Sequence, residues 1–199
     1  GETMYLRMEI TEDDQSVTYY VTDATAWWKE MNQLKEENVR DSLTGLLNRK
    51  GFHDGLESLF TCQEQLKHAA MIMLDADGLK LVNDIYGHHI GDDYLKRIAS
   101  ALDERTRGRK LSARLGGDEF ILFLYGYSAK IDLEQDIEKL RERRGECFLG
   151  ESENVPVTLE FSMGYAFYPD DDRDYHVLMH LADQNMYEEK RKRKKWRRA

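Results

Sequence analysis

Acidic side chains stand at the ends of two strongly apolar segments of this 199-residue sequence. Asp75 closes the run HAAMIMLDA (68–76), and Asp118 and Glu119 directly precede the run FILFL (120–124). If these segments are neighbouring strands, three carboxylates converge at one edge of a sheet, where their mutual repulsion is costly without a cation. Oxygen-only ligands favour Mg²⁺ or Mn²⁺. The pattern therefore predicts a metal site suited to phosphoryl chemistry.

Two glycines, Gly116 and Gly117, come just before the Asp118–Glu119 pair. Adjacent glycines between two apolar runs predict a tight hairpin turn, and they let a ligand approach the backbone closely. An ordinary surface turn with acidic residues explains the same four residues without any ligand. The rest of the chain has to decide between these two interpretations.

The spacing of apolar residues predicts the elements that must position these carboxylates. Helical stripes occur at Phe52/Leu56/Leu59/Phe60, Leu95/Ile98/Ala99/Leu102, Leu133/Ile137/Leu140 and Leu178/Leu181/Ala182/Met186. Strands are predicted at 68–76, on both sides of the Gly-Gly turn, and as one continuous strand within 155–169. This alternation predicts an α/β (α+β) sandwich, in which a mainly antiparallel sheet is flanked by helices.

Composition narrows the class of protein. Hydrophobic residues make up 41% and charged residues 34%, which is typical of a soluble globular chain. No apolar run is long enough for a transmembrane segment, and the acidic N-terminus is unlike a signal peptide. The two cysteines, Cys62 and Cys147, lack neighbours at metal-ligand spacing, so neither a disulfide framework nor a zinc site is expected and a reducing cytoplasm is favoured.

Charge is distributed unevenly along the chain. The net charge is −9, yet the run KRKRKKWRR (190–198) carries eight basic residues, so the remainder carries −17. Binding of nucleic acid by the body of the protein is therefore not expected. The basic run itself is either a solvated helix end or a segment that touches RNA or an anionic membrane.

The N-terminal part differs in character from the rest. Residues 1–22 contain the β-prone run SVTYYVT, which is too short to form a sheet alone. Residues 23–40 predict a helix capped by Asp23 or Thr25. Its apolar stripe either pairs with a second copy of itself or packs on its own domain; it consists of Trp27, Met31 and Leu34.

Four motifs follow one another in register from residue 41 to about residue 195. They are DSLTGLLNRKGF (41–52), LDADGLKLVNDIYGHHIGDDYL (74–95), GGDEF (116–120) and LADQNMYEEK (181–190). In these motifs the sequence resembles the GGDEF domain of bacterial diguanylate cyclases. The resemblance implies a palm-like nucleotidyl-cyclase fold over 41–199 and a cytoplasmic enzyme. Such an enzyme condenses two GTP into cyclic di-GMP with release of two pyrophosphates, as a homodimer with one GTP per subunit.

The resemblance also implies roles for individual residues. Metal ligands would be Asp75, the carbonyl of Ala76, Asp118 and Glu119, with Asp118 or Glu119 as the catalytic base. The phosphates would be held by the backbone amides of Gly78 and Leu79, which open a helix, and by Lys80, Lys190 and Lys194. Lys194 stands where the family usually has an arginine, so a point charge replaces a bidentate contact. Guanine would be bound by Asn83 and Asp92, and the substrate would lie against Gly116 and Gly117.

Several points stay open at this level. The family's inhibitory Arg-x-x-Asp site is degenerate, because Arg107 is present but Lys110 replaces the aspartate. Arg114 either orders the hairpin turn or meets phosphate. Asp92 is also compatible with a plain charge at a helix N-terminus. His88 and His89 are expected to be loop residues rather than metal ligands.

The sequence also leaves two alternative functions open and suggests a domain upstream of this chain. One rival is a catalytically silent, GTP-binding regulatory module, and another is a cyclase that accepts ATP in one half-site. The segment VTYYVTDATAWW is similar to the last strand of a PAS sensor and the start of its signalling helix. This similarity implies an N-terminal sensor domain in the full-length protein.

Overall fold

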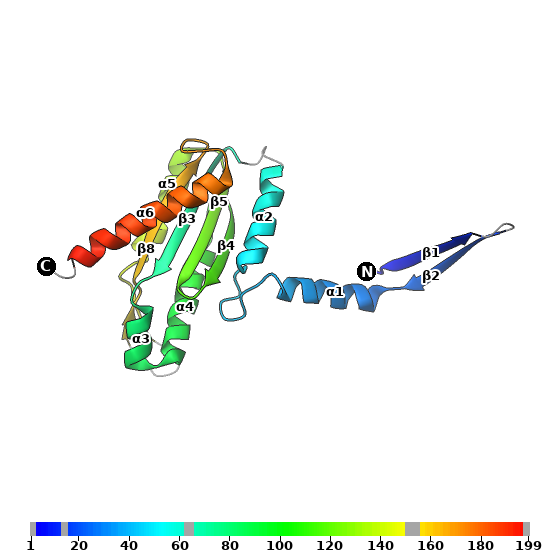
Figure 1. Ribbon diagram of the computed structural model, residues 1–199, viewed down its shortest axis with the longest axis horizontal. Coiled ribbons are helices and arrows are strands. Elements are labelled where there is room, and N and C mark those ends of the chain that lie inside the picture. Colours follow the sequence, from blue (N-terminus) through cyan, green and yellow to red (C-terminus); the bar gives the residue numbers. More distant parts are fainter. Residues whose placement is uncertain (1–2, 13–15, 62–65, 150–155, 197–199) are drawn as a thin grey trace. The chain divides into compact units, whose positions relative to one another are not determined.

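The computed structural model describes residues 3–12, 16–61, 66–149 and 156–196, in two compact units, Gly1–Val39 and Arg40–Ala199. The larger unit is built on a four-stranded sheet with the order β4-β5-β3-β8, in which every neighbouring pair is antiparallel. Figure 1 shows these strands side by side; they are β3 (His68–Ala76), β4 (Arg109–Gly116), β5 (Glu119–Tyr127) and β8 (Phe161–Tyr168). The predicted antiparallel sheet is confirmed.

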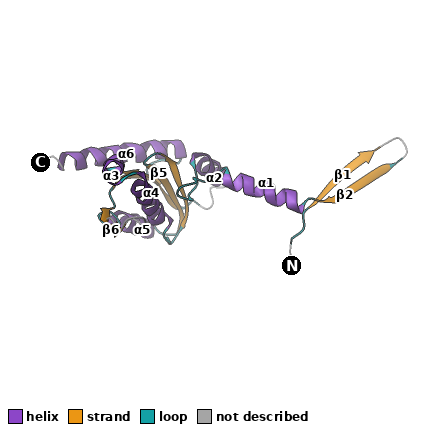
Figure 2. Ribbon diagram, turned by 90° about the horizontal axis from the view of Figure 1, so that it is seen from below, coloured by secondary structure: helices purple, strands orange, loops and turns teal. Residues whose placement is uncertain are grey.

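Helices cover both faces of this sheet, as Figure 2 shows. On one side lie α2 (Arg49–Thr61) and α6 (Tyr175–Trp196), and on the other lie α4 (His88–Asp103) and α5 (Lys130–Glu142). The short helix α3 (Leu79–Tyr86) follows β3 and packs against α4. The four helical stripes expected from the sequence therefore face the sheet.

The central strand β3 serves two separate cores. Ile72 and Leu74 lie in the core formed with α4 and α5, whereas Met71 and Met73 lie in the core formed with α2 and α6. Successive side chains of a strand point to opposite faces, so a strand covered on both sides reads as one continuous apolar run. This double burial explains why the sequence segment that delivers Asp75 is so hydrophobic.

Two predictions of local structure are wrong. His88 and His89 do not lie in a loop, because they are the first two residues of α4. The segment 155–169 does not form one strand; it contains β7 (Pro156–Thr158), which pairs with β6 (Cys147–Leu149), and then β8. The interruption lies at Leu159 and Glu160, where the Leu159 amide donates to the carbonyl of Glu146 and the Leu159 carbonyl accepts from Gly145. These contacts pull the chain toward the loop after α5, away from β3.

Helix α6 approaches the backbone of β8 unusually closely. A Cβ atom on Gly164 would lie 2.0 Å from the backbone nitrogen of Met186 and 2.4 Å from the carbonyl oxygen of Ala182. Only glycine permits this contact, so Gly164 fixes the height of α6 above the sheet. The same contact sets the position of the basic residues that begin at Lys190 on this helix.

The smaller unit consists of the antiparallel hairpin β1 (Leu6–Glu12) and β2 (Val17–Asp23), followed by α1 (Thr25–Glu37). Of the two capping residues that the sequence offered, Asp23 makes the contact at the start of the helix, since its Oδ1 accepts from the Thr25 amide at 2.8 Å. Every residue of both strands is exposed. In the predicted stripe, Trp27 is 60% exposed, and the side chain of Leu34, like the whole of Cys62, lies outside the described residues.

None of the helices in the described ranges has the length and hydropathy required to cross a bilayer.

Candidate functional site

The predicted carboxylates meet at one edge of the sheet, at the end of β3 and the start of β5. Asp75 is the cross-strand partner of Glu119, and the Ala76 amide donates to the carbonyl of Asp118 at 2.8 Å. The turn just before β5 contains Gly117 with φ 57°, a left-handed conformation that glycine adopts without strain. Antiparallel pairing therefore places acidic residues that are more than 40 positions apart in sequence next to one another.

Asp75 lies in a charged and confined environment. Burial raises the pKa of its carboxyl above the ordinary value, and the negative charges of Asp118 and Asp77 add to the rise. The hydrogen bond from the ammonium of Lys190, at 2.5 Å from Asp75 Oδ1, opposes the rise but does not cancel it. Asp75 is thus paired with Lys190 while two further carboxylates, Asp118 and Asp77, lie close to it.

The carboxylates at this edge of the sheet do not point toward one common position that a metal ion could occupy. Across the described ranges, no group of three or more Asp, Glu, His or Cys side chains is arranged to hold a metal ion. Asp75 is instead bound by Lys190, and Glu119 is exposed. A metal at this edge would therefore require a small rearrangement of carboxylates that the backbone has already brought together.

Arg114 orders the glycine turn, which decides between its two possible roles. Its Nε and Nη2 donate to the carbonyl of Gly117 at 3.1 and 2.8 Å, and its Nη1 lies 3.3 Å from Asp41 Oδ1. Asp41 also accepts from the amide and the hydroxyl of Thr44 at 2.9 and 2.6 Å. The motif DSLTG therefore acts as a brace for the turn, through the pair Asp41–Arg114.

Replacing Asp41 by asparagine is expected to lower the free energy of unfolding by about 1.5–3 kcal/mol at pH 7, since hydrogen bonds to a charged group are lost. Burial opposes ionisation of Asp41, but Thr44 and Arg114 outweigh it and hold its pKa below the ordinary value. The stabilisation is then complete above the unfolded pKa of about 4 and disappears as pH falls through the lowered folded pKa. Urea unfolding at several pH values measures the difference from the wild type. Asp54→Asn, at an exposed position of α2, is the control; equal or pH-independent losses would contradict the brace.

Helix α3 begins directly after the carboxylate edge. Gly78, with φ 80°, is its N-cap residue and Leu79 its first residue. The first amides of a helix have no partners within the helix and favour anions. Lys80 is exposed in the same turn. These predicted phosphate-binding groups thus lie a few residues beyond Asp75.

Asn83 and Asp92, the predicted guanine ligands, lie on α3 and α4, which pack against each other. Between them is Gly91, where a Cβ atom would lie 1.8 Å from Asn83 Oδ1. Glycine at this position therefore allows the two helices to approach and places Asn83 beside the turn that carries Asp92. Asn83 Oδ1 is buried without a hydrogen-bond partner in the described part of the chain, whereas Asp92 is exposed.

Comparison with known proteins identifies the family to which this chain belongs. The sequence profile of the family described as "Diguanylate cyclase, GGDEF domain" matches residues 38–195. The chain belongs to the GGDEF family.

Relatives of this GGDEF domain include two diguanylate cyclases of Escherichia coli (strain K12). DgcP is 34% identical over 176 residues, which cover 83% of this chain and 50% of DgcP. DgcN is 36% identical over 162 residues, which cover 81% of this chain and 39% of DgcN. The chain therefore spans half or less of the length of these relatives.

Solved structures agree with the fold of this GGDEF domain. The coiled coil and GGDEF domain of DgcB from Caulobacter crescentus, in complex with c-di-GMP, gives a TM-score of 0.71 at 26% identity, covering 83% of this chain and 87% of that chain. The GGDEF domain of TpbB (YfiN) from Pseudomonas aeruginosa gives 0.67 at 30% identity, covering 77% and 89%. The predicted family and fold class are confirmed.

The residues predicted to form a degenerate inhibitory site, Arg107 and Lys110, have structural contacts. Arg107 binds α5, since its Nη1 lies 2.7 Å from Asp132 Oδ1 and its amide donates to Asp136. Lys110 closes the end of α4, because its ammonium donates to the carbonyls of Leu102 and Glu104 at 3.1 and 2.7 Å. A cation at the C-terminal end of a helix is stabilising. The residue that replaces the aspartate is therefore engaged in the fold.

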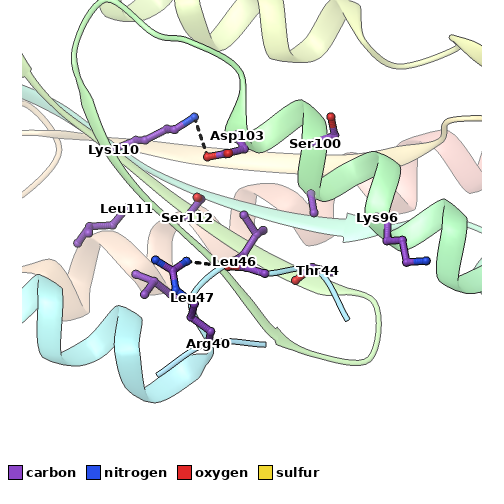
Figure 3. A pocket seen from close by; sticks show the side chains of 12 residues that line it. Arg40, Thr44, Leu46, Leu47, Lys96, Ser100, Asp103, Lys110, Leu111 and Ser112 are labelled. Carbon is purple, nitrogen blue, oxygen red and sulfur yellow. Dashed lines mark hydrogen bonds and ion pairs between the residues drawn. The ribbon is translucent and has the colours of Figure 1, made fainter. Parts of the chain in front are cut away.

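A pocket of about 600 Å³ lies elsewhere on the GGDEF domain, between the 40–47 loop, α4 and β4 (Figure 3). Its basic residues are Arg40, Lys96 and Lys110, and Lys110 extends to Asp103 at 3.3 Å. Of the residues predicted for catalysis, nucleotide binding or inhibition, Lys110 alone is among those that line it. The pocket is thus separate from the carboxylate edge.

A second set of residues beside the carboxylate edge was not predicted from the sequence. Asp77 Oδ2 accepts from the hydroxyl of Ser162 at 2.8 Å and pairs with Arg193 at 3.1 Å. The buried hydroxyl of Tyr94 lies 2.8 Å from the carbonyl of Asp77 and accepts from the Glu160 amide at 2.9 Å. One signal was available: Arg193 is three residues after Lys190, so both lie on one face of a helix.

Proposed function

We propose that this GGDEF domain is a diguanylate cyclase, which converts two GTP into cyclic di-GMP and two pyrophosphates. The observation that carries the proposal is the pairing of β3 with β5, which sets Asp75 against the Asp118–Glu119 turn. The start of α3 and the ammonium of Lys190 lie beside the same edge. Carboxylates for a metal and donors for a triphosphate are thus arranged together, as phosphoryl transfer requires.

The residues of this edge fit a divalent cation, Mg²⁺ or Mn²⁺. Their donor atoms are all oxygens, and Asp75, Asp118 and Glu119 offer negative charge to a cation. Asp75, the Ala76 carbonyl, Asp118 and Glu119 would hold the ion. When bound, it supplies Lewis-acid stabilisation of the charge that develops on the phosphoryl oxygens.

The remaining steps fall to residues of the chain. The amides of Gly78 and Leu79, with Lys80, Lys190 and Lys194, bind the β- and γ-phosphates. Asp118 or Glu119 accepts the proton of the 3′-hydroxyl as its oxygen attacks the α-phosphorus of the other GTP, and pyrophosphate departs. A second attack of the same kind closes the ring.

Two domains are needed for this reaction, because each site holds one GTP. An antiparallel arrangement of two copies brings each 3′-hydroxyl to the opposite α-phosphate, and this proximity supplies much of the rate. Residues 23–40 are the device that we propose for controlling the pairing. The catalytic domain is then 41–199, in the bacterial cytoplasm, where the free thiol of Cys147 remains reduced.

Residues 1–22 are proposed to be the end of a PAS-like sensor domain. An isolated two-stranded hairpin is marginally stable in water, and this one exposes apolar side chains along both strands. Further strands of a sensor sheet would cover them. Relatives that are about twice as long or longer leave room for such a domain.

The test of function is incubation with GTP and Mg²⁺, followed by chromatography of the products over a range of protein concentrations. We expect cyclic di-GMP, with a specific activity that rises with protein concentration until the dimer is saturated. The rival is a silent GTP-binding module. That rival is correct if GTP binds with Mg²⁺ while no product forms at any concentration.

Inhibition by the product through Arg107 is expected to be weak or absent. The ammonium of Lys110 has no lone pair to accept hydrogen bonds from guanine, whereas an aspartate would accept them. Loss of a hydrogen bond to a charged group corresponds to about 10- to 150-fold in affinity. Calorimetry with cyclic di-GMP measures this directly. Tight binding that disappears in Arg107→Ala would contradict the prediction.

A further inference from the structure

The last turn of α6 is attached to the carboxylate edge by one guanidinium group. Nη1 of Arg193 lies 3.1 Å from Asp77 Oδ2 and also donates to the carbonyl of Phe161, while Nη2 donates to Glu160. The side chains of Arg193, Asp77 and Glu160 are only 21%, 10% and 26% exposed. Three acceptors, one just after β3 and two at the start of β8, thus converge on a single, largely buried cation.

A second contact lies one helical turn earlier. Lys190 binds Asp75 at 2.5 Å, and Lys190 and Arg193 are at positions i and i+3, on the same face of the helix. Asp75 and Asp77, two residues apart at the end of β3, each receive one cation from α6. The two contacts therefore align the end of α6 along the site.

The earlier part of α6 is held by different contacts. Asn185 Nδ2 donates to the carbonyl of Tyr165 at 2.9 Å, and Glu189 accepts from the Met163 amide at 2.6 Å. Beyond Glu189, Lys190 and Arg193 continue the attachment toward the carboxylate edge. The next residue, Lys194, is exposed and lies one turn after Lys190, so its position depends on how Arg193 is held.

We propose that Arg193 is the positioning residue of the triphosphate clamp. It fixes the last turn of α6, so that Lys190 and Lys194 face the phosphates, and it neutralises Asp77 and Glu160, which would otherwise repel an anionic nucleotide. The planar fork of a guanidinium serves several acceptors at once, which a lysine ammonium cannot do with the same geometry. This inference rests on the proposed function, because the clamp is meaningful only for a nucleotide at that edge.

The test is the affinity for 3′-deoxy-GTP with Mg²⁺, measured by calorimetry. This nucleotide lacks the attacking hydroxyl, so binding is observed without turnover. Arg193→Ala is expected to weaken binding at least about tenfold, the lower end for hydrogen bonds to charged groups. In steady state with GTP, KM should rise while kcat at saturation changes little, because Arg193 does not touch the reacting atoms.

Three further variants separate positioning from charge. Lys192→Ala removes the same charge from the same turn at a side chain that is 75% exposed, and it should leave affinity nearly unchanged. Arg193→Lys keeps the charge but loses the fork, so it should weaken binding by an intermediate factor and remain folded. In a Glu160→Gln background, the effect of Arg193→Ala should be smaller, since less uncompensated charge is left behind.

The outcomes are distinct. Equal weakening in Lys192→Ala and Arg193→Ala, or none in Arg193→Ala, overturns the positioning role. If the wild type binds 3′-deoxy-GTP but makes no cyclic di-GMP from GTP, the proposed catalysis fails while the clamp is still judged by affinity. If the wild type binds no nucleotide, both proposals fail.

Discussion

Alanine in place of Asp118 or Asp75 is expected to lower the rate of cyclic di-GMP synthesis by ~10²–10³ or more, the loss typical of one preorganised transition-state contact. The reason is the geometry of the β3–β5 edge, where the Asp118 carbonyl accepts from the Ala76 amide. Burial, together with the nearby charge of the Asp118 carboxylate, raises the pKa of Asp75. Removing either carboxylate removes a ligand of the proposed metal. Product formation with GTP and Mg²⁺ is the measurement.

Matched variants show whether a loss of activity comes from the missing carboxylate or from misfolding. Asp75→Asn keeps the shape of the side chain and should be as inactive as the alanine variant, because a neutral amide is a poor ligand for a hard cation. Asp183→Ala removes a carboxylate from an exposed position of α6 and should retain wild-type activity. Thermal unfolding confirms that each variant is folded. Full activity of Asp75→Ala or Asp118→Ala, or of the wild type in excess chelator, would show that the metal mechanism is wrong.

The parts of the fold that the sequence predicted are those with local signals. β3 is buried on both faces, so its apolar run stands out, and the glycine pair marks the hairpin that follows. The break between β7 and β8 had no such signal, because it depends on hydrogen bonds of Leu159 with Gly145 and Glu146. Local patterning finds elements, and it does not show where a strand leaves its sheet.

The same contrast between local signals and long-range contacts applies to the residues of the site. Its carboxylates were found because each stands where an apolar run begins or ends. Arg193 was missed because its partner Glu160 is 33 residues away, and the packing of α6 against β8, which Gly164 permits, brings them together. Lys110 was interpreted through the aspartate that it replaces, while its contacts with the end of α4 depend on how β4 starts. Ion pairs between residues on different helices and strands depend on how those elements pack, so the sequence alone does not reveal them.

Selection of guanine over adenine is expected to depend on Asp92. Guanine presents two donors on one edge, N1–H and the exocyclic amine, and an ionised carboxylate accepts both. Adenine presents a lone pair at N1, so acceptor would face acceptor. A site built to hydrogen-bond its substrate can reject an analogue that lacks the partner group by ~10⁴–10⁵. From an equal mixture of GTP and ATP, cyclic di-GMP should therefore be the only cyclic dinucleotide.

The structure supports this role through the neighbours of Asp92. Gly91 lets α3 pack so closely that Asn83 lies beside the turn of Asp92, and the amide oxygen of Asn83 accepts no hydrogen bond within the described residues. Both groups therefore retain capacity for a ligand. A charge that only stabilised the start of α4 would need no such neighbour.

Replacing Asp92 by serine is expected to relax the selection and allow mixed cyclic GMP-AMP to appear beside cyclic di-GMP. A hydroxyl can act as donor or acceptor, so it tolerates the N1 lone pair of adenine that a carboxylate rejects. Asp103→Ser, at a side chain that is 70% exposed near the other end of α4, is the control and should still make cyclic di-GMP alone. Chromatography of products from the GTP and ATP mixture compares the three proteins. Substantial cyclic GMP-AMP from the unmutated protein would show that Asp92 does not set the specificity.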